Sequence, residues 1–169
     1  MFTIRPCFDA ALLADLGSRT FYQAYHPFFP ADEMAAYLAK NFVPADIEAE
    51  LATGTSWFFV QWQGDAPLGY TKLRSDRSHE VVTGRNALEM QRIYLLDEAK
   101  GKGAGKMLLV DSENFCKKQG YECMWLAVWQ ENKDAQAFYL RNGFANRGTA
   151  VFKWPNGETH DFVMVKEME

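Results

Sequence analysis

The chain has 169 residues, 48% of them hydrophobic, which is an ordinary size for one globular domain with a buried core. Its 22 acidic and 18 basic residues give a net charge of -4, which excludes the broad basic surface of a nucleic-acid-binding protein. The three cysteines fit neither a disulfide framework nor a paired zinc motif, and no apolar run reaches the roughly 20 residues of a membrane span. We therefore expect a single cytoplasmic domain over residues 1–169 that holds no metal and binds neither nucleic acid nor a membrane.

The first part of the chain predicts one strand followed by three helices. Residues 1–6 are typical of an opening strand, and Asp9 can cap a helix whose apolar residues recur at helical spacing towards Tyr25. Two short helices are predicted over residues 31–41 and 44–52, the second with proline in its first turn. These two helices are candidates for a movable wall over a binding site.

The rest of the chain predicts strands that alternate with helices. Aromatic and β-branched runs at residues 57–62 and 68–73 predict an antiparallel hairpin, followed by a polar loop over 74–86 and a strand over 88–95. The later expected elements are a helix over 105–119 ended by Gly120, a strand over 124–129, a helix capped by Asn132 and ended before Gly143, and a closing hairpin of residues 145–153 and 161–165 across Pro155-Asn156-Gly157.

A glycine-rich run, Gly101-Lys102-Gly103-Ala104-Gly105, lies between the strand that stops at Asp97 and the following helix. The first N–H groups of a helix have no partner within it and attract phosphate, while glycine lets the backbone approach an anion closely. Lys100, Lys102 and Lys106 add positive charge around the same place. From the residues alone, a solvated turn before a helix is an equally good interpretation.

The spacing of this run excludes two common phosphate loops. A P-loop would need glycine in place of Lys100 and serine or threonine in place of Met107, and a dinucleotide fingerprint would need a small residue in place of Lys106. The spacing Lys100-x-x-Gly103-x-Gly105 instead resembles the acetyl-CoA loop of the GNAT superfamily of N-acetyltransferases. That family more often has arginine or glutamine where Lys100 stands, so we expect slightly altered phosphate contacts here.

The resemblance extends from residue 57 to residue 144, over which the order of strand, loop, helix, strand and helix matches the family. Trp125-Leu126-Ala127-Val128-Trp129, Asn132, and Phe138-Tyr139 followed by Asn142-Gly143-Phe144 look like the family's second cofactor region. The resemblance implies an α/β (α+β) fold with a mixed, mostly antiparallel central sheet flanked by helices. It also implies acetyl-CoA as co-substrate. The cofactor-binding residues it implies are Ile93, Tyr94, Leu95, Lys100, Gly101, Lys102, Gly103, Ala104, Gly105, Lys106, Asn132, Ala135 and Tyr139.

Two residues are candidates for proton transfer. Strand alternation would put Glu89 on one face with Gln91 and Ile93, from which Glu89 could take a proton from an amine directly or through water. The alternative is a salt-bridged strand carboxylate. Tyr139 would be an ordinary core tyrosine on position alone, but its place in the resemblance favours a general acid that gives a proton to the departing thiolate. A direct transfer of this kind needs no cysteine nucleophile.

Within the superfamily the chain is most similar to bacterial spermidine/spermine N-acetyltransferases. The residues that carry this resemblance are Thr20-Phe21 with Tyr25, Glu89-x-x-Arg92-Ile93-Tyr94, Trp125-Leu126-x-Val128-Trp129-x-x-Asn132, and Asp161 with Met164-x-Lys166. A small primary amine, with a polyamine such as spermidine or spermine first, is therefore the expected acceptor, and Glu33, Glu131 and Asp134 are candidate anionic partners for it. Three points stay open: acetylation of a protein N-terminus or lysine, a non-catalytic acyl-CoA-binding regulatory module, and assembly as a homodimer.

Overall fold

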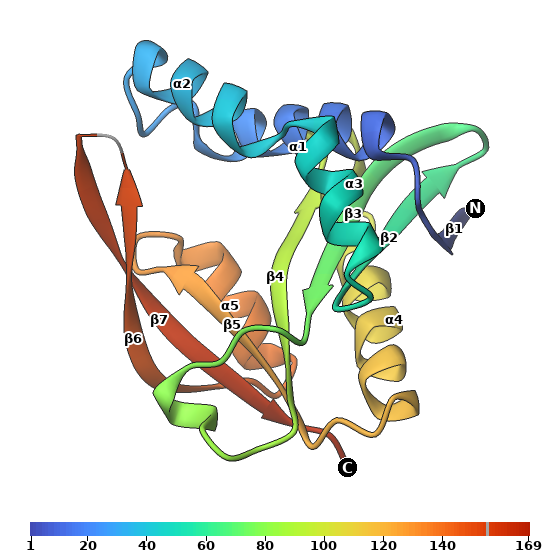
Figure 1. Ribbon diagram of the computed structural model, residues 1–169, viewed down its shortest axis with the longest axis vertical. Helices are drawn as coiled ribbons and strands as arrows, with labels where there is room; N and C mark the ends of the chain where they lie inside the picture. Colours follow the sequence, from blue (N-terminus) through green and yellow to red (C-terminus); the bar gives the residue numbers. More distant parts are fainter. Residues whose placement is uncertain (155) are drawn as a thin grey trace.

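The computed structural model, which describes residues 1–154 and 156–169, has a seven-stranded sheet at its centre (Figure 1). The strand order is β1-β2-β3-β4-β5-β7-β6, and neighbouring strands are antiparallel except for the parallel pair β4 and β5. This confirms the expected mixed, mostly antiparallel sheet. The strands are β1 (Phe2–Pro6), β2 (Ser56–Gln63), β3 (Ala66–Arg74), β4 (Ala87–Leu95), β5 (Cys123–Trp129), β6 (Ala145–Trp154) and β7 (Gly157–Glu167).

Helices cover both faces of the sheet. The α-helices are α1 (Ala10–Tyr25), α2 (Ala31–Asn41), α3 (Pro44–Ala52), α4 (Ala104–Lys118) and α5 (Lys133–Arg141). Alternation along β2 separates the two cores, because Phe58 and Val60 pack with α1 and α3, whereas Trp57 and Phe59 lie against Phe115 of α4. The helix α5 packs in the same core as α4.

The predicted elements are observed with boundaries shifted by one or two residues, except that β7 is longer than expected. Both predicted helix caps form: Asp9 accepts a hydrogen bond from the Leu12 N–H at 3.0 Å, and Asn132 accepts one from the Ala135 N–H at 3.1 Å. The predicted loop 74–86 also contains a short 3-10 helix, Glu80–Val82, and β7 begins at Gly157, earlier than expected. Pro155 of the predicted last turn lies outside the described residues.

A β-bulge in β4 changes which residues share a face. Lys72 of β3 lies opposite Arg92, but the next residue, Leu73, lies opposite Met90, so Gln91 is the extra residue. Glu89 therefore shares a face with Arg92 and Tyr94, while Ile93 lies on the other face in the α4 core. The expectation that Glu89, Gln91 and Ile93 share one face was wrong, because strict alternation does not survive a bulge.

The parallel strands β4 and β5 separate beyond the bulge. In the described residues they pair only where Ala87–Glu89 meets Cys123–Trp125. Over the last residues of β4, the backbone groups on the side that faces β5 therefore have no paired strand in the described part of the chain. This separation positions the site described below.

An aromatic cluster links α1, α2 and the last residue of β6, a strand that lies below α2 in Figure 1. The ring of Trp154 stacks on Phe29 with centroids 3.9 Å apart and lies 4.7 Å from Tyr37 of α2. Among the described residues, no helix is long and apolar enough to cross a membrane.

Candidate active site

A cavity of about 890 Å³, here called the large cavity, opens where β4 and β5 separate. Its walls come from β4, the glycine-rich run, the start of α4, the end of β5 and α5. Every residue implied for cofactor binding lines it except Lys102. These residues are Ile93, Tyr94, Leu95, Lys100, Gly101, Gly103, Ala104, Gly105, Lys106, Asn132, Ala135 and Tyr139.

The glycine-rich run presents the N-terminus of α4 to this cavity. Gly101 and Gly103 have φ angles of 72° and 80°, and Gly103 is the residue that precedes the helix. Gly105 has no positive φ, and a Cβ there would make only ordinary contacts, 3.5 Å from Leu95 and 3.9 Å from Phe138. Packing does not require glycine at this position, so its effect is to keep space open beside the first N–H groups of α4.

The lysines near this run already have local partners. Lys100 forms an ion pair with Asp97 at 2.5 Å, and Lys106 donates to the side-chain oxygen of Asn142. Both contacts are exposed, and surface ion pairs contribute little to stability, so the two ammonium groups can turn to an anion at small cost. Lys102 lies outside the lining of either cavity described here.

Tyr139 is held between the core and the large cavity. Its side chain is 8% exposed, and its ring packs edge-on against Phe138 and Phe144. Burial raises the pKa of its phenol above the ordinary value of 10.0. Tyr139 therefore carries its proton at neutral pH, which is the state that a general acid needs.

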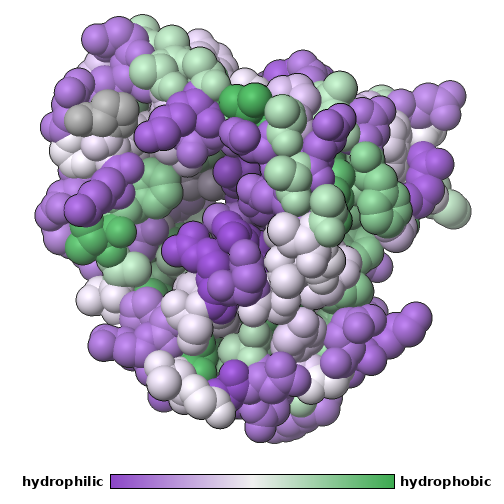
Figure 2. All heavy atoms as spheres, viewed as in Figure 1, coloured by the Kyte–Doolittle hydropathy of each residue, from purple (hydrophilic) through white to green (hydrophobic). Residues whose placement is uncertain are grey.

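A second cavity of about 220 Å³, here called the small cavity, adjoins the large one. Figure 2 shows the surface hollowed between the β6–β7 hairpin on the left and the centre of the molecule. Aromatic side chains from α1, α2, β5 and β6 form much of its wall. The residues that line both cavities are Tyr25, Gln91, Arg92, Tyr94, Ala127 and Trp129.

Glu89 lines the small cavity and not the large one. Its carboxylate lies 3.7 Å from the Nε of Arg77, and the residue is 5% exposed. Burial raises the pKa of Glu89, although Arg77 and Arg74 oppose the shift. Both sequence interpretations thus have a structural counterpart: the carboxylate is paired, and it faces a cavity.

Three site features were not predicted from the sequence. Asp161 of β7 lies opposite Trp129 in the ladder with β5, lines the small cavity, and has its pKa raised by burial to about 6. The side-chain oxygen of Gln91 is buried without a hydrogen-bond partner between the two cavities. Arg92 lines both cavities; like Asp161, it was quoted from the sequence only as part of a resemblance, without a role at the site. Only the fold brings β4 and β7 to one cavity, so no local signal marks this set.

The acidic residues proposed as partners of a polyamine do not all line the same cavity. Glu131 and Asp134 line the large cavity beside α5. Glu33 lines neither cavity and instead accepts a hydrogen bond from Asn156 at 3.0 Å. The three carboxylates therefore do not form one binding surface.

Comparison with known proteins identifies the class. The model of the acetyltransferase (GNAT) family matches residues 18–144, which is more than half of the chain. The chain belongs to this family and is an N-acetyltransferase. An uncharacterised N-acetyltransferase of Lactobacillus delbrueckii subsp. lactis is 28% identical over 90% of this chain and 88% of that protein.

Two further relatives bear on the fold and on the acceptor. The crystal structure of the PaiA N-acetyltransferase from Thermoplasma acidophilum in complex with coenzyme A has a TM-score of 0.81 over 99% of both chains, at 21% identity. A spermidine N(1)-acetyltransferase of the same organism is 36% identical, but over only 50% of this chain and 47% of that protein. The first similarity concerns the fold alone.

Proposed function

We propose that the large cavity binds acetyl-CoA and that a primary amine in the small cavity receives the acetyl group by direct attack. The observation that carries this proposal is that the two cavities adjoin at Tyr25, Tyr94 and Trp129, so that two ligands can meet there. When bound, acetyl-CoA supplies a thioester whose carbonyl carbon accepts the amine and whose sulfur departs. The family membership and the glycine-lined N-terminus of α4 support this choice of co-substrate.

Two groups of backbone atoms would hold the co-substrate. The N–H groups at the start of α4, next to Gly103 and Gly105, suit its diphosphate, and Lys100 and Lys106 add charge. The free side of β4 at Ile93, Tyr94 and Leu95 offers backbone donors and acceptors to an amide-bearing chain and a donor to the developing oxyanion. Asn132 and Ala135 close the opposite wall.

The reaction releases one proton overall. The ammonium of the acceptor, with a reference pKa of about 10.4, must lose a proton before its nitrogen can attack. A second proton would leave that nitrogen as the amide bond forms and the C–S bond breaks. Tyr139 would protonate the departing sulfur and then regain a proton from solvent, which leaves one proton released overall. Glu89 is the base proposed from the sequence, and Asp161 is a second carboxylate in the same cavity.

A polyamine such as spermidine or spermine is the acceptor that the sequence resemblance favours. The partial similarity to a spermidine acetyltransferase and the aromatic wall of the small cavity support it. The size of that cavity, about 220 Å³, favours a small molecule over a protein segment, because it is smaller than the roughly 300–1,000 Å³ of pockets that bind drug-sized ligands.

A thiol-release assay with acetyl-CoA and a panel of amines tests this function. We expect release that depends on an added small primary amine, and mass spectrometry should find that amine acetylated. Reactions without amine and with a tertiary amine are the controls. Activity on peptides with none on small amines would select protein acetylation, and tight acetyl-CoA binding without turnover would select a regulatory module.

A further inference from the structure

Arg92 is a cation without an acidic partner at the wall of the small cavity. Across residues 1–154 and 156–169, no carboxylate lies within ion-pair distance of its guanidinium. The group lies 4.7 Å from the ring centre of Phe42, which joins α2 to α3, and Tyr37 and Tyr70 are its polar neighbours. An arginine keeps its charge in proteins, so this guanidinium is a fixed positive charge in an aromatic environment.

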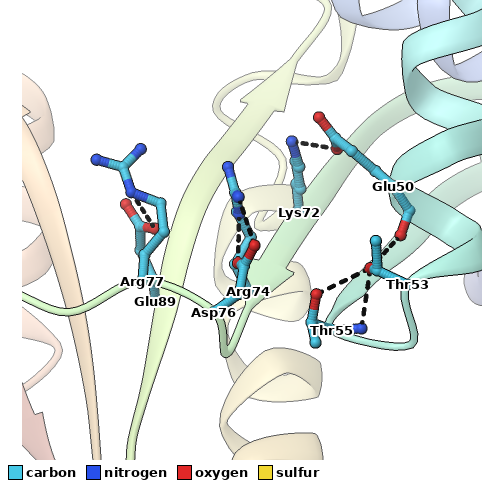
Figure 3. Close-up of polar contacts among 8 residues, drawn as sticks. All are labelled: Glu50, Thr53, Thr55, Lys72, Arg74, Asp76, Arg77 and Glu89. Carbon is cyan, nitrogen blue, oxygen red and sulfur yellow. Dashed lines mark hydrogen bonds and ion pairs between the residues drawn. The ribbon is translucent and has the colours of Figure 1, made fainter.

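Three nearby cations, on β3 and in the loop that follows it, are each paired with a carboxylate. Figure 3 shows Lys72 with Glu50, Arg74 with Asp76 and Arg77 with Glu89. The distances are 2.5, 2.8 and 3.7 Å. Arg92 differs from these three cations because it has no ion-pair partner among the described residues. It also lines both cavities.

Among the described residues, Asp161 is an acidic residue without a basic partner at the wall of the same cavity. Its carboxylate lines the small cavity and has no ion pair or hydrogen bond within the part of the chain that the structure describes. The charge of Asp161 contributes to the raised pKa of Tyr25 in α1, whereas the tyrosines beside Arg92 are Tyr70 of β3, Tyr37 of α2 and Tyr94 of β4. One cavity therefore carries an anion and a cation that do not neutralise each other.

We propose that the acceptor amine carries an anionic oxygen group, as an amino acid does, with Arg92 binding this anion and Asp161 binding the ammonium. A planar guanidinium matches a carboxylate through two parallel hydrogen bonds, which makes the carboxylate the best-fitting anion. Burial of a charge is costly unless a partner compensates it, and such a ligand compensates both residues at once.

This inference rests on the proposed function and replaces the polyamine as its first acceptor. Spermidine and spermine carry only positive charges and would place one of them near Arg92 or leave Arg92 uncompensated. The chemistry of transfer is unchanged: the amine gains the acetyl group, coenzyme A leaves as the thiol, and one proton is released.

The wild-type protein is tested first with matched acceptors. The panel contains amino acids with the amine on the α, β or γ carbon, the same amines without the carboxylate, the corresponding amides, aminoalkyl phosphonates, and spermidine and spermine. We expect kcat/KM for the best carboxylate-bearing amine to exceed that of its uncharged counterpart by at least about tenfold, as a charged hydrogen bond allows. The phosphonates show whether the site selects carboxylate or any oxyanion.

Variants then assign the preference to Arg92. Arg92→Gln should lower kcat/KM about tenfold or more for the carboxylate-bearing amine and far less for its uncharged counterpart. Arg74→Gln is the matched control, because Arg74 lies on the same sheet face, is paired with Asp76 and lines neither cavity. It should leave the ratio of the two kcat/KM values unchanged.

The outcomes separate this inference from the proposed function. Polyamines or plain amines acetylated as efficiently as every anion-bearing amine would overturn the inference and leave N-acetylation of small amines intact. An unchanged preference in folded Arg92→Gln would overturn the role of Arg92. Absence of amine-dependent thiol release across the whole panel would instead overturn the proposed function. If Arg92→Gln does not fold, the wild-type comparison still decides.

Discussion

The hydroxyl oxygens of Tyr25 and Tyr94 lie 3.3 Å apart, and both tyrosines line both cavities. Tyr25 ends α1, whereas Tyr94 follows the bulge in β4, so this contact ties the first helix to the strand that separates from β5. Burial raises the pKa of both phenols, so both are protonated at neutral pH. One of them donates to the other, and the pair fixes the boundary between the two cavities.

This pair predicts a non-additive effect on stability. Tyr25→Phe and Tyr94→Phe should each lower the free energy of unfolding by about 1 kcal/mol, because each leaves one hydroxyl without its partner. The double variant should lose clearly less than the sum, since no hydroxyl is then left unpaired. Urea unfolding of all four proteins measures the coupling. Strictly additive losses would show that the hydroxyls do not interact in solution.

Tyr139→Phe should reduce turnover without unfolding the protein. The change removes the buried hydroxyl and keeps the ring that packs against Phe138 and Phe144. Loss of a general acid lowers kcat by about 100-fold or more, whereas KM for acetyl-CoA should change little. Tyr121→Phe is the control, because Tyr121 packs in the same core and lines neither cavity. Unchanged kcat in Tyr139→Phe would remove Tyr139 from the mechanism.

The sequence predicted the parts of the site that depend on local pattern. The glycine spacing from Gly101 to Gly105, the cap at Asn132 and the position of Tyr139 on its helix follow from chain order, and the structure brings all of them to the large cavity. The helices and strands were predicted for the same reason. Local periodicity reports which residues face a core, and short-range spacing reports turns and caps.

The sequence could not predict the parts that depend on register. The bulge at Gln91 inverts the faces of all later residues of β4, and nothing in the run from Glu89 to Tyr94 marks it. Asp161 reaches the small cavity through pairing of β7 with β5, which is a contact between distant segments. Glu89, proposed from the sequence as a base on the strand that leads to the glycine-rich run, lines the small cavity and not the large one.

Gly103→Ala should weaken co-substrate binding more than it weakens the fold. Gly103 has a φ of 80°, and a Cβ there would touch no other atom, so the cost is backbone strain of about 1 kcal/mol. Displacement of the first turn of α4 should raise KM for acetyl-CoA by roughly tenfold. Gly64→Ala is the matched control, with a φ of 61° and equally open space in the β2–β3 turn. A similar KM in both variants would contradict the phosphate role.

Asp161→Asn should make the protein more stable at pH 8 and less active. The folded-state pKa of Asp161 is raised from 3.8 to about 6, so the charged carboxylate is disfavoured in the native state. The native protein binds more protons than the unfolded chain between these values, and its free energy of unfolding therefore falls as pH rises through them. Removing the charge should recover roughly 1 kcal/mol at pH 8, after allowance for partial exposure.

The stability gain of the same variant should shrink as the pH falls from 8 to 4, because the native carboxylate becomes protonated below its pKa of about 6. Urea unfolding of the wild type and Asp161→Asn at pH 4, 6 and 8 measures this, with Tyr25 and His160 as the neighbours whose interactions must be considered. The activity of Asp161→Asn should fall, because the ammonium of the acceptor loses its anionic partner. A carboxylate that destabilises the fold and is needed for turnover is retained for its chemistry. A stability gain that is equal at all three pH values would show that Asp161 acts through packing instead.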